Sequence, residues 1–208
     1  MAIRRIAQLL TLTTLALGCR PAAAPTPNDA TPATADGADA ADQTDDQGAQ
    51  RKRILAAKQA LFERLSGRLR EAMQTQGPAA AIEVCHREAP EIAKEVGAKH
   101  KVAIGRTALK RRNPNNVAPT WAEPLIERRT TTPEFVDLPD GRLGALLPIK
   151  LQAQCLMCHG SPEDIPEIVR ARLDELYPDD QAVGFAEGDL RGWFWVESPP
   201  RTTQLPGP

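Results

Sequence analysis

The sequence predicts an α+β fold with an antiparallel sheet, and two observations lead to that class. Segments with helical periodicity come first after residue 50, whereas short segments with strand-like alternation come mainly later, two of them joined by a tight turn. The length of this region, residues 51–208, fits one domain of ordinary size. We therefore expect helices packed against a single sheet.

The expected helices span residues 51–76, 78–87, 91–96, 121–129 and 162–176. Apolar residues recur at helical spacing in the first of them, and Gly77 follows its last residue, as is typical of a helix end. Pro90 is expected to break or restart the second helix, because proline lacks the backbone donor that a helix interior needs. Gly97 is the expected end of the third.

The expected strands span residues 102–107, 134–138, 142–151 and 192–197. Apolar and polar residues alternate in the first strand, which is the pattern of a half-buried strand. Residues 139–141, with the sequence Pro-Asp-Gly, separate the second and third strands and predict a β-hairpin.

The first nineteen residues have the features of an export signal. Two arginines precede a mostly apolar stretch, residues 6–17, that is too short to span a bilayer. The letters LALGC at positions 15–19 resemble a bacterial lipobox, which implies cleavage before Cys19 and lipidation of its sulfur. An ordinary signal peptide with an incidental cysteine is the alternative. We expect a lipid-anchored protein on the periplasmic side, and Arg20 after the lipidated cysteine favours the outer membrane.

Residues 20–50 predict a disordered linker. They are almost entirely Ala, Pro, Thr, Asp, Gly and Gln, and they contain no Leu, Ile, Val or aromatic residue. Such a segment buries too little apolar surface to offset the entropy lost on ordering.

The overall charge excludes some classes of protein. The chain has 26 Lys and Arg against 27 Asp and Glu, for a formal net charge of −1. Nucleic-acid-binding proteins normally carry a basic excess, so no nucleic-acid partner is expected. We also see no acid–base pair or activated nucleophile in the sequence, and therefore expect no enzymatic activity.

One motif carries recognisable chemistry, the letters CLMCH at positions 155–159. Two thiols three positions apart, followed directly by a histidine, are the pattern of covalent haem c attachment. In that chemistry Cys155 and Cys158 form thioethers with the two vinyl groups, and His159 ligates the iron. A zinc site is less favoured, because zinc usually takes two such pairs. A thioredoxin-like dithiol would follow a βαβ pattern, which is absent.

The residues alone leave the sixth iron ligand open. Cys19 is assigned to lipid and the motif cysteines to haem, so Cys85 remains alone in an oxidising compartment, where it is either an ordinary core residue or a ligand. The candidates for the sixth position are Cys85, His86, His100, Met73 or none of these.

The sequence resembles a known family, the exported PAS-like domains that bind one c-type haem and were long catalogued as a domain of unknown function. The resemblance covers most of residues 55–198 and depends on the joint order of several segments. These are AIEVCHREAP (81–90), IGRTALKRRNPNN (104–116) with Trp121 and Glu123, CLMCHG (155–160) and YPDDQAVGFAEGDLRG (177–192).

The resemblance implies a PAS-like sheet and an unusual His/Cys ligand set, with His159 proximal and Cys85 distal. His86 departs from the family pattern, in which we expect Lys or Arg at that position, and a His/His pair therefore stays open. Arg106 is a candidate contact for a haem propionate, as are Arg111 and Arg112, because a planar guanidinium suits a carboxylate.

The expected function is a sensor of redox state or of a diatomic gas, with one covalent haem c. A thiolate ligand favours ferric iron, so loss of Cys85 on reduction would open a site for CO or NO. The alternative is a tethered cytochrome that transfers single electrons. Either function needs a partner, a redox or signalling protein that the sequence does not identify.

Overall fold

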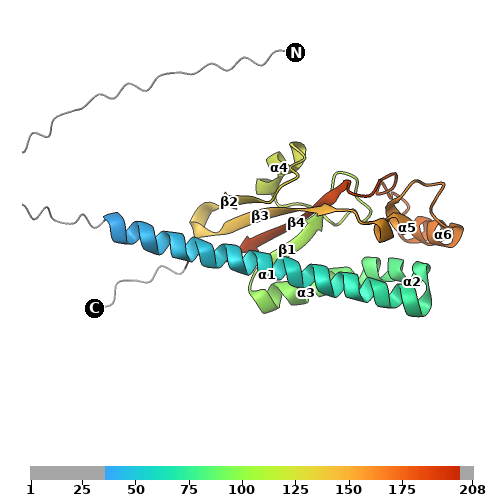
Figure 1. Ribbon diagram of the computed structural model, residues 1–208, viewed down its shortest axis with the longest axis horizontal. Coiled ribbons are helices and arrows are strands. Elements are labelled where there is room, and N and C mark those ends of the chain that lie inside the picture. The colour runs from blue at the N-terminus through green and yellow to red at the C-terminus, as the bar shows by residue number, and fades with distance from the viewer. Residues whose placement is uncertain (1–35, 202–208) are drawn as a thin grey trace, which may run out of the picture. The chain divides into compact units, whose positions relative to one another are not determined.

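The computed structural model describes residues 36–201, with side chains from residue 46 on (Figure 1). The helices are α1 (Asp36–Gln76), α2 (Pro78–Glu83), α3 (Ala89–His100), α4 (Glu123–Glu127), α5 (Leu156–His159) and α6 (Glu167–Leu176). The strands are β1 (Ala103–Thr107), β2 (Glu134–Asp137), β3 (Leu143–Lys150) and β4 (Leu190–Ser198). The predicted α+β class is confirmed. Within residues 36–201 no helix is both long and apolar enough to cross a membrane.

The four strands form one antiparallel sheet in the order β1-β4-β3-β2. The predicted hairpin is confirmed as β2 and β3, joined by a turn in which Asp140 and Gly141 take positive φ angles of 64° and 75°. The last strand, β4, lies in the middle of the sheet and pairs with both β1 and β3. The result is a PAS-like sheet with helices on both faces (Figure 1).

Both faces of β4 are covered, which explains why its central residues 193–196 are all apolar. Phe194 and Val196 belong to the core that the sheet shares with α1 and α3. Trp193 belongs to a second core with Leu125 of α4 and Leu146 of β3. Side chains alternate between the two faces of a strand, so each face receives its own apolar set.

Helix α1 buries one side against the sheet and α3. Its buried apolar residues are Ile54, Ala57, Leu61, Leu65 and Ala72. Two other apolar residues of the same helix, Leu55 and Phe62, lie on the exposed side, with 47% and 38% of their surface accessible. The burial follows the 3.6-residue period predicted for residues 51–76.

The boundary predicted for the linker is wrong at its C-terminal end. Helix α1 begins at Asp36, so residues 36–50 of the segment predicted to be disordered are helical. At the end of this stretch Gln50 is only 4% exposed, and its amide donates hydrogen bonds to the carbonyls of Gly141 and Pro199, each at 2.9 Å. Polar contacts anchor the segment where apolar burial does not. The signal peptide predicted for residues 1–19, its Cys19 and residues 20–35 lie outside the described residues.

The chain does not break at Pro90. Helix α2 continues through a π-helical turn, Val84–Glu88, directly into α3, and Pro90 occupies the first turn of α3, where its missing donor costs little. Helix α3 also runs past Gly97 to His100 and ends with Lys101 in the left-handed conformation. The π-helical turn holds Cys85 and His86.

Two other helical segments differ from the prediction in where they begin or end. Helix α6 begins at Glu167 rather than at residue 162, because Pro166 takes an extended conformation just before it. The segment predicted as a helix over residues 121–129 consists of a 3₁₀ turn, Thr120–Ala122, and the short α4.

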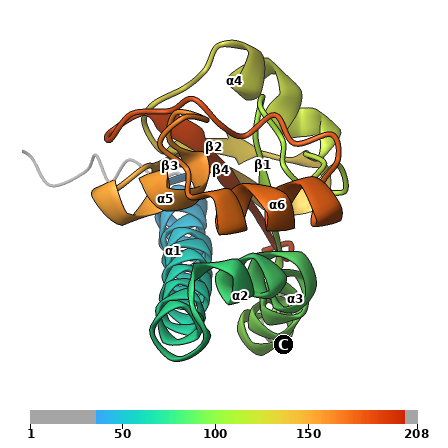
Figure 2. The same ribbon diagram turned by 90° about the vertical axis from the view of Figure 1, so that its right-hand side faces the viewer.

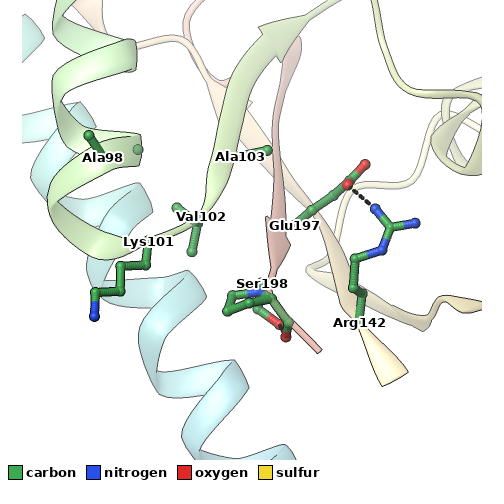
Figure 3. Close-up of a pocket in the computed structure, with 9 residues that line it drawn as sticks. Ala98, Lys101, Val102, Ala103, Arg142, Glu197 and Ser198 are labelled. Atoms are coloured by element: carbon green, nitrogen blue, oxygen red, sulfur yellow. Dashed lines mark hydrogen bonds and ion pairs between the residues drawn. The ribbon is translucent and has the colours of Figure 1, made fainter. Parts of the chain in front are cut away.

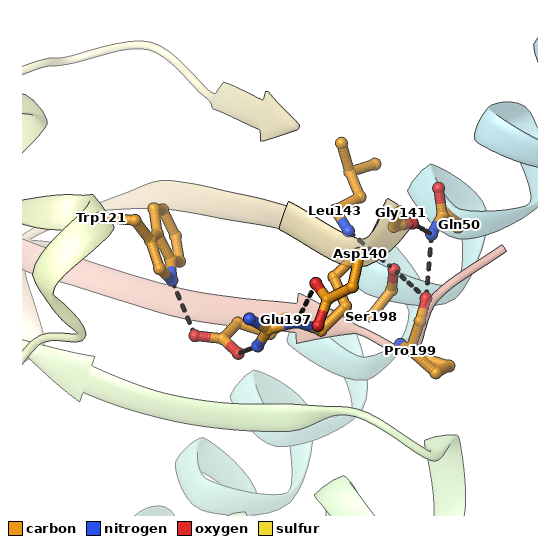
Figure 4. A network of polar contacts seen from close by, with 9 residues as sticks. Gln50, Trp121, Asp140, Gly141, Leu143, Glu197, Ser198 and Pro199 are labelled. Carbon is orange, nitrogen blue, oxygen red and sulfur yellow. Dashed lines mark hydrogen bonds and ion pairs between the residues drawn. The ribbon is translucent and has the colours of Figure 1, made fainter. Parts of the chain in front are cut away.

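A polar network joins Trp121 and Arg142 to Glu197, near the end of β4 (Figure 4). The Trp121 indole donates a hydrogen bond to one Glu197 oxygen, and the Arg142 guanidinium donates to the other, both at 2.7 Å. An open groove lies beside this network, between the end of α3, the start of β1 and the end of β4 (Figure 3). The CLMCH motif is not among the residues that line it.

Candidate cofactor site

The CLMCH motif begins at the end of a 3₁₀ turn and continues as the short helix α5. Residues 153–155 form a 3₁₀ turn, and α5 follows directly. Within the described part of the chain, Cys155, Cys158 and Cys85 are free thiols. Burial is the main cause that raises the pKa of Cys158, to about 11, and nearby Cys85 raises it further. The buried thiol therefore stays protonated near neutral pH.

Cys158 packs at the edge of a small apolar cluster between α2 and α6. The cluster includes Ile82 of α2, Val169 and Leu173 of α6, and Tyr177. Figure 2 shows α6 lying above α2 at this end of the molecule. The motif is thus held against the helix that leads into Cys85.

His159 has the orientation expected of a metal ligand. Its Nδ1 lies 2.7 Å from the carbonyl oxygen of Ala182, which can only accept, so Nδ1 carries the proton and donates. Nε2 is left with its lone pair for coordination, and a second hydrogen bond of this kind typically fixes the ring of a ligating histidine. Burial, with the charges of Arg112 and Arg191, holds the His159 pKa well below its usual value, so the imidazole is neutral.

Residues 182–185 hold the motif from the opposite side. The Gly184 amide donates to the Gly160 carbonyl at 2.8 Å, and the Phe185 amide donates to the His159 carbonyl at 3.0 Å. The Phe185 ring meets the His159 ring edge to face, with centroids 6.4 Å apart. This segment therefore fixes both the backbone and the ring of His159.

Arg112 locks these two segments together. Its Nε donates to Asp180 at 2.8 Å, and its Nη2 donates to the carbonyls of Cys158 and Ala182. The two charged side chains are only 8% and 11% exposed. Because Ala182 also accepts from His159, Arg112 supports the histidine through a shared carbonyl. These bonds engage two of its three nitrogens inside the protein, which argues against the propionate contact predicted for it.

We expect Arg112→Ala to lower the free energy of unfolding by about 3–5 kcal/mol, because it leaves Asp180 buried without its partner. Chemical denaturation monitored by circular dichroism measures this loss. The neighbouring Arg111 is exposed, so Arg111→Ala is a matched control, expected to change stability by no more than about 0.5 kcal/mol. Equal losses in both variants would contradict the role given to Arg112.

Cys85 comes to the motif from a distant part of the sequence. It lies in the π-helical turn. Burial is the main cause that raises the pKa values of Cys158 and Tyr177, and the charge of nearby Cys85 raises both further. The structure therefore brings Cys85 close to Cys158, the residue directly before His159. Cys85 and His159 are the two iron ligands that the family resemblance implies, and their ligation stays a prediction. Single π-helical turns are frequent at functional sites.

His86, the alternative ligand, makes a different contact. Its ring lies edge to face on Tyr177, with centroids 5.1 Å apart. Its Nδ1 is buried and finds no hydrogen-bond partner among residues 36–201. The burial of the Tyr177 hydroxyl raises the pKa of that group to about 12, with Cys85 adding to the shift.

Arginines converge on the same region from two strands. Arg106 of β1 pairs in register with Phe194, and its positive charge contributes to lowering the pKa values of His159 and Arg191, for which burial is the main cause. Arg191, at the start of β4, was not predicted as a site residue. The family resemblance includes its segment, but no periodicity or spacing assigns it a role.

Within the part of the chain that the structure describes, no three or more His, Cys, Asp or Glu side chains are grouped as a metal site. The candidate iron ligands are the two residues that the family resemblance implies, Cys85 and His159, and Cys158 of the motif lies near Cys85. The fold and this set of residues define a PAS-like domain with a c-type haem motif.

Comparison with known proteins supplies the family. A family model described as Tll0287-like matches residues 40–199, and the chain therefore belongs to the Tll0287-like family. This match confirms the resemblance found in the sequence. A solved structure, described as the crystal structure of the cyanobacterial heme-protein Tll0287, is 29% identical, with a TM-score of 0.45. The similarity covers 57% of this chain and 73% of the other. No curated protein matches this chain.

Proposed function

We propose that this chain is a haem c protein that senses redox state or a diatomic gas from the periplasmic side of a membrane. Membership of the Tll0287-like family supports haem binding, since a relative described as a heme-protein carries that family's name. The proposal assigns thioether bonds to Cys155 and Cys158, proximal ligation to His159 and distal ligation to Cys85.

The geometry of His159 is the observation that carries this proposal. A histidine whose Nδ1 proton is held by Ala182, and whose Nε2 is free, is prepared for an iron rather than for acid–base chemistry. Two free thiols precede it in the motif, and a third, that of Cys85, lies in the π-helical turn after α2, near Cys158. The donor set fits one haem with a His/Cys ligand pair.

Bound haem supplies one-electron chemistry and an iron position that a small gas can occupy. The protein supplies the ligands that decide when that position opens. As a thiolate, Cys85 would stabilise ferric iron more than ferrous iron, and would therefore be the ligand more easily lost on reduction. Cys85 lies in a π-helical turn, a feature that is frequent at functional sites. The hydrogen bond to Ala182 would hold the His159 ring whether or not Cys85 is bound.

Export and anchoring are part of the same proposal. The signal predicted for residues 1–19 delivers the chain to a compartment where haem c is attached, and lipidated Cys19 tethers it to a membrane, with Arg20 favouring the outer one. Its partner is a redox or signalling protein, and the proposal includes no nucleic-acid partner.

The test compares the two oxidation states of the mature protein. We expect the ferric form to be low-spin and thiolate-ligated, and the ferrous form to bind carbon monoxide, as measured by optical and electron paramagnetic resonance spectra. A ferrous protein that keeps both ligands and excludes carbon monoxide would contradict the sensor. Such a result, together with fast electron exchange, would instead support the tethered electron carrier.

A further inference from the structure

Arg191 is a half-buried cation with an unused donor. Its Nη1 donates to the Lys110 carbonyl at 2.9 Å. Its Nε is buried and has no hydrogen-bond partner among the described residues 36–201. Buried donors in folded proteins are normally satisfied, and a charged donor is especially costly to leave alone. The free Nε therefore points to a ligand.

The side chains around Arg191 leave an excess of positive charge. Burial lowers the pKa of Arg191 to about 10, and the charges of Arg112 and Arg106 add to this effect. The one nearby carboxylate that opposes it, on Asp180, is already bound by Arg112 at 2.8 Å. An additional anion at this place would balance the excess charge.

Arg191 lies close enough to His159 for its charge to contribute to lowering the pKa of the imidazole. The Phe185 ring is next to both side chains, with its centroid 6.4 Å from that of the His159 ring and 5.7 Å from Cζ of Arg191. The β-bulge between β3 and β4 lies at the same point, where the register shifts between Ile149 and Lys150. Bulges commonly redirect a side chain beside a functional site.

We propose that Arg191, together with Arg106, binds a propionate carboxylate of the haem. The inference rests on the proposed function and adds a residue to it. A guanidinium can donate two parallel hydrogen bonds to a carboxylate, and the free Nε of Arg191 leaves one such edge available. A haem attached at α5 would bring its own carboxylates into this part of the molecule, so the anion needs no separate source.

The experiment uses the mature protein with haem that is isotope-labelled at its propionate carboxyl carbons. Redox-difference infrared spectra are recorded for the wild type, Arg191→Gln and Arg191→Lys. We expect the labelled carboxylate band to shift in Arg191→Gln and to shift less in Arg191→Lys, which keeps the charge but loses the fork. Arg170→Gln, which removes an exposed arginine of α6, is expected to leave the band in place. An unshifted band in both Arg191 variants would overturn the assignment.

A free small anion is the competing occupant, and a second measurement separates it. Acetate and inorganic phosphate are titrated into the wild type and Arg191→Gln while the midpoint potential is followed. We expect no response in either protein. A saturable response that is lost in Arg191→Gln would overturn the propionate assignment in favour of a free anion.

Pyridine haemochrome spectra of each sample distinguish a failure of this inference from a failure of the proposed haem c function. Haem c present with unshifted bands contradicts the role of Arg191 alone. A wild-type chain without haem c contradicts both.

Discussion

Replacing Cys155 and Cys158 together by serine abolishes covalent haem attachment. The hydroxyl groups of the two serines do not form the thioether bonds that the thiols form with the vinyl groups. His159 remains in place in this variant, since its hydrogen bond to Ala182 involves no cysteine side chain. The expected outcome is complete loss of haem from the denatured protein, as measured by intact mass and by haem staining after denaturing electrophoresis.

Cys85→Ala is the matched control for this experiment, because it removes the third thiol of the described chain and leaves both thioether bonds. We expect it to retain haem after denaturation. Haem that survives denaturation in the double serine variant would show that attachment does not use the CLMCH motif.

Cys85→Ala raises the midpoint potential and changes the spin state of the ferric iron. If ferric iron binds the thiolate 10²–10⁴-fold more tightly than ferrous iron does, a relation of ~59 mV per decade predicts a rise of about 120–240 mV. A ferric iron without its sixth protein ligand is expected to become high-spin or to bind water. Potentiometric titration and electron paramagnetic resonance measure the two effects.

His86→Phe tests the neighbouring position in the same π-helical turn. Phenylalanine keeps an aromatic ring against Tyr177 but has no nitrogen, so a positioning role survives and ligation does not. We expect the ferric spectrum to stay low-spin in this variant. If His86→Phe loses the low-spin signal while Cys85→Ala keeps it, the distal ligand is His86 and the account of Cys85 is wrong.

The parts of the fold and of the candidate site that the sequence predicted have short, fixed spacing. The CLMCH motif occupies five consecutive positions, and the hairpin at β2 and β3 follows from a three-residue turn. The environment of His159 is different in kind. Its hydrogen bond to Ala182 joins residues 23 positions apart, and the bond from Arg112 to Cys158 joins residues 46 apart. Such contacts leave no periodic pattern in the sequence.

Two features of the fold were missed for separate physical reasons. Residues 36–50, at the start of α1, contain no large apolar residue, so composition predicted disorder there. Gln50 is instead fixed by the backbone carbonyls of Gly141 and Pro199. The π-helical turn at Cys85 differs from an α-helix by a single residue in its hydrogen-bond pattern, and the apolar periodicity around it is that of an ordinary helix.

The intact mass of the mature protein, measured after denaturation together with its pyridine haemochrome spectrum, decides whether haem is covalently attached to this chain. We expect one haem to be retained per chain, with the spectrum of a haem attached through two thioether bonds. A colourless chain of unmodified mass, purified from a cell that matures its other c-type cytochromes, would contradict it.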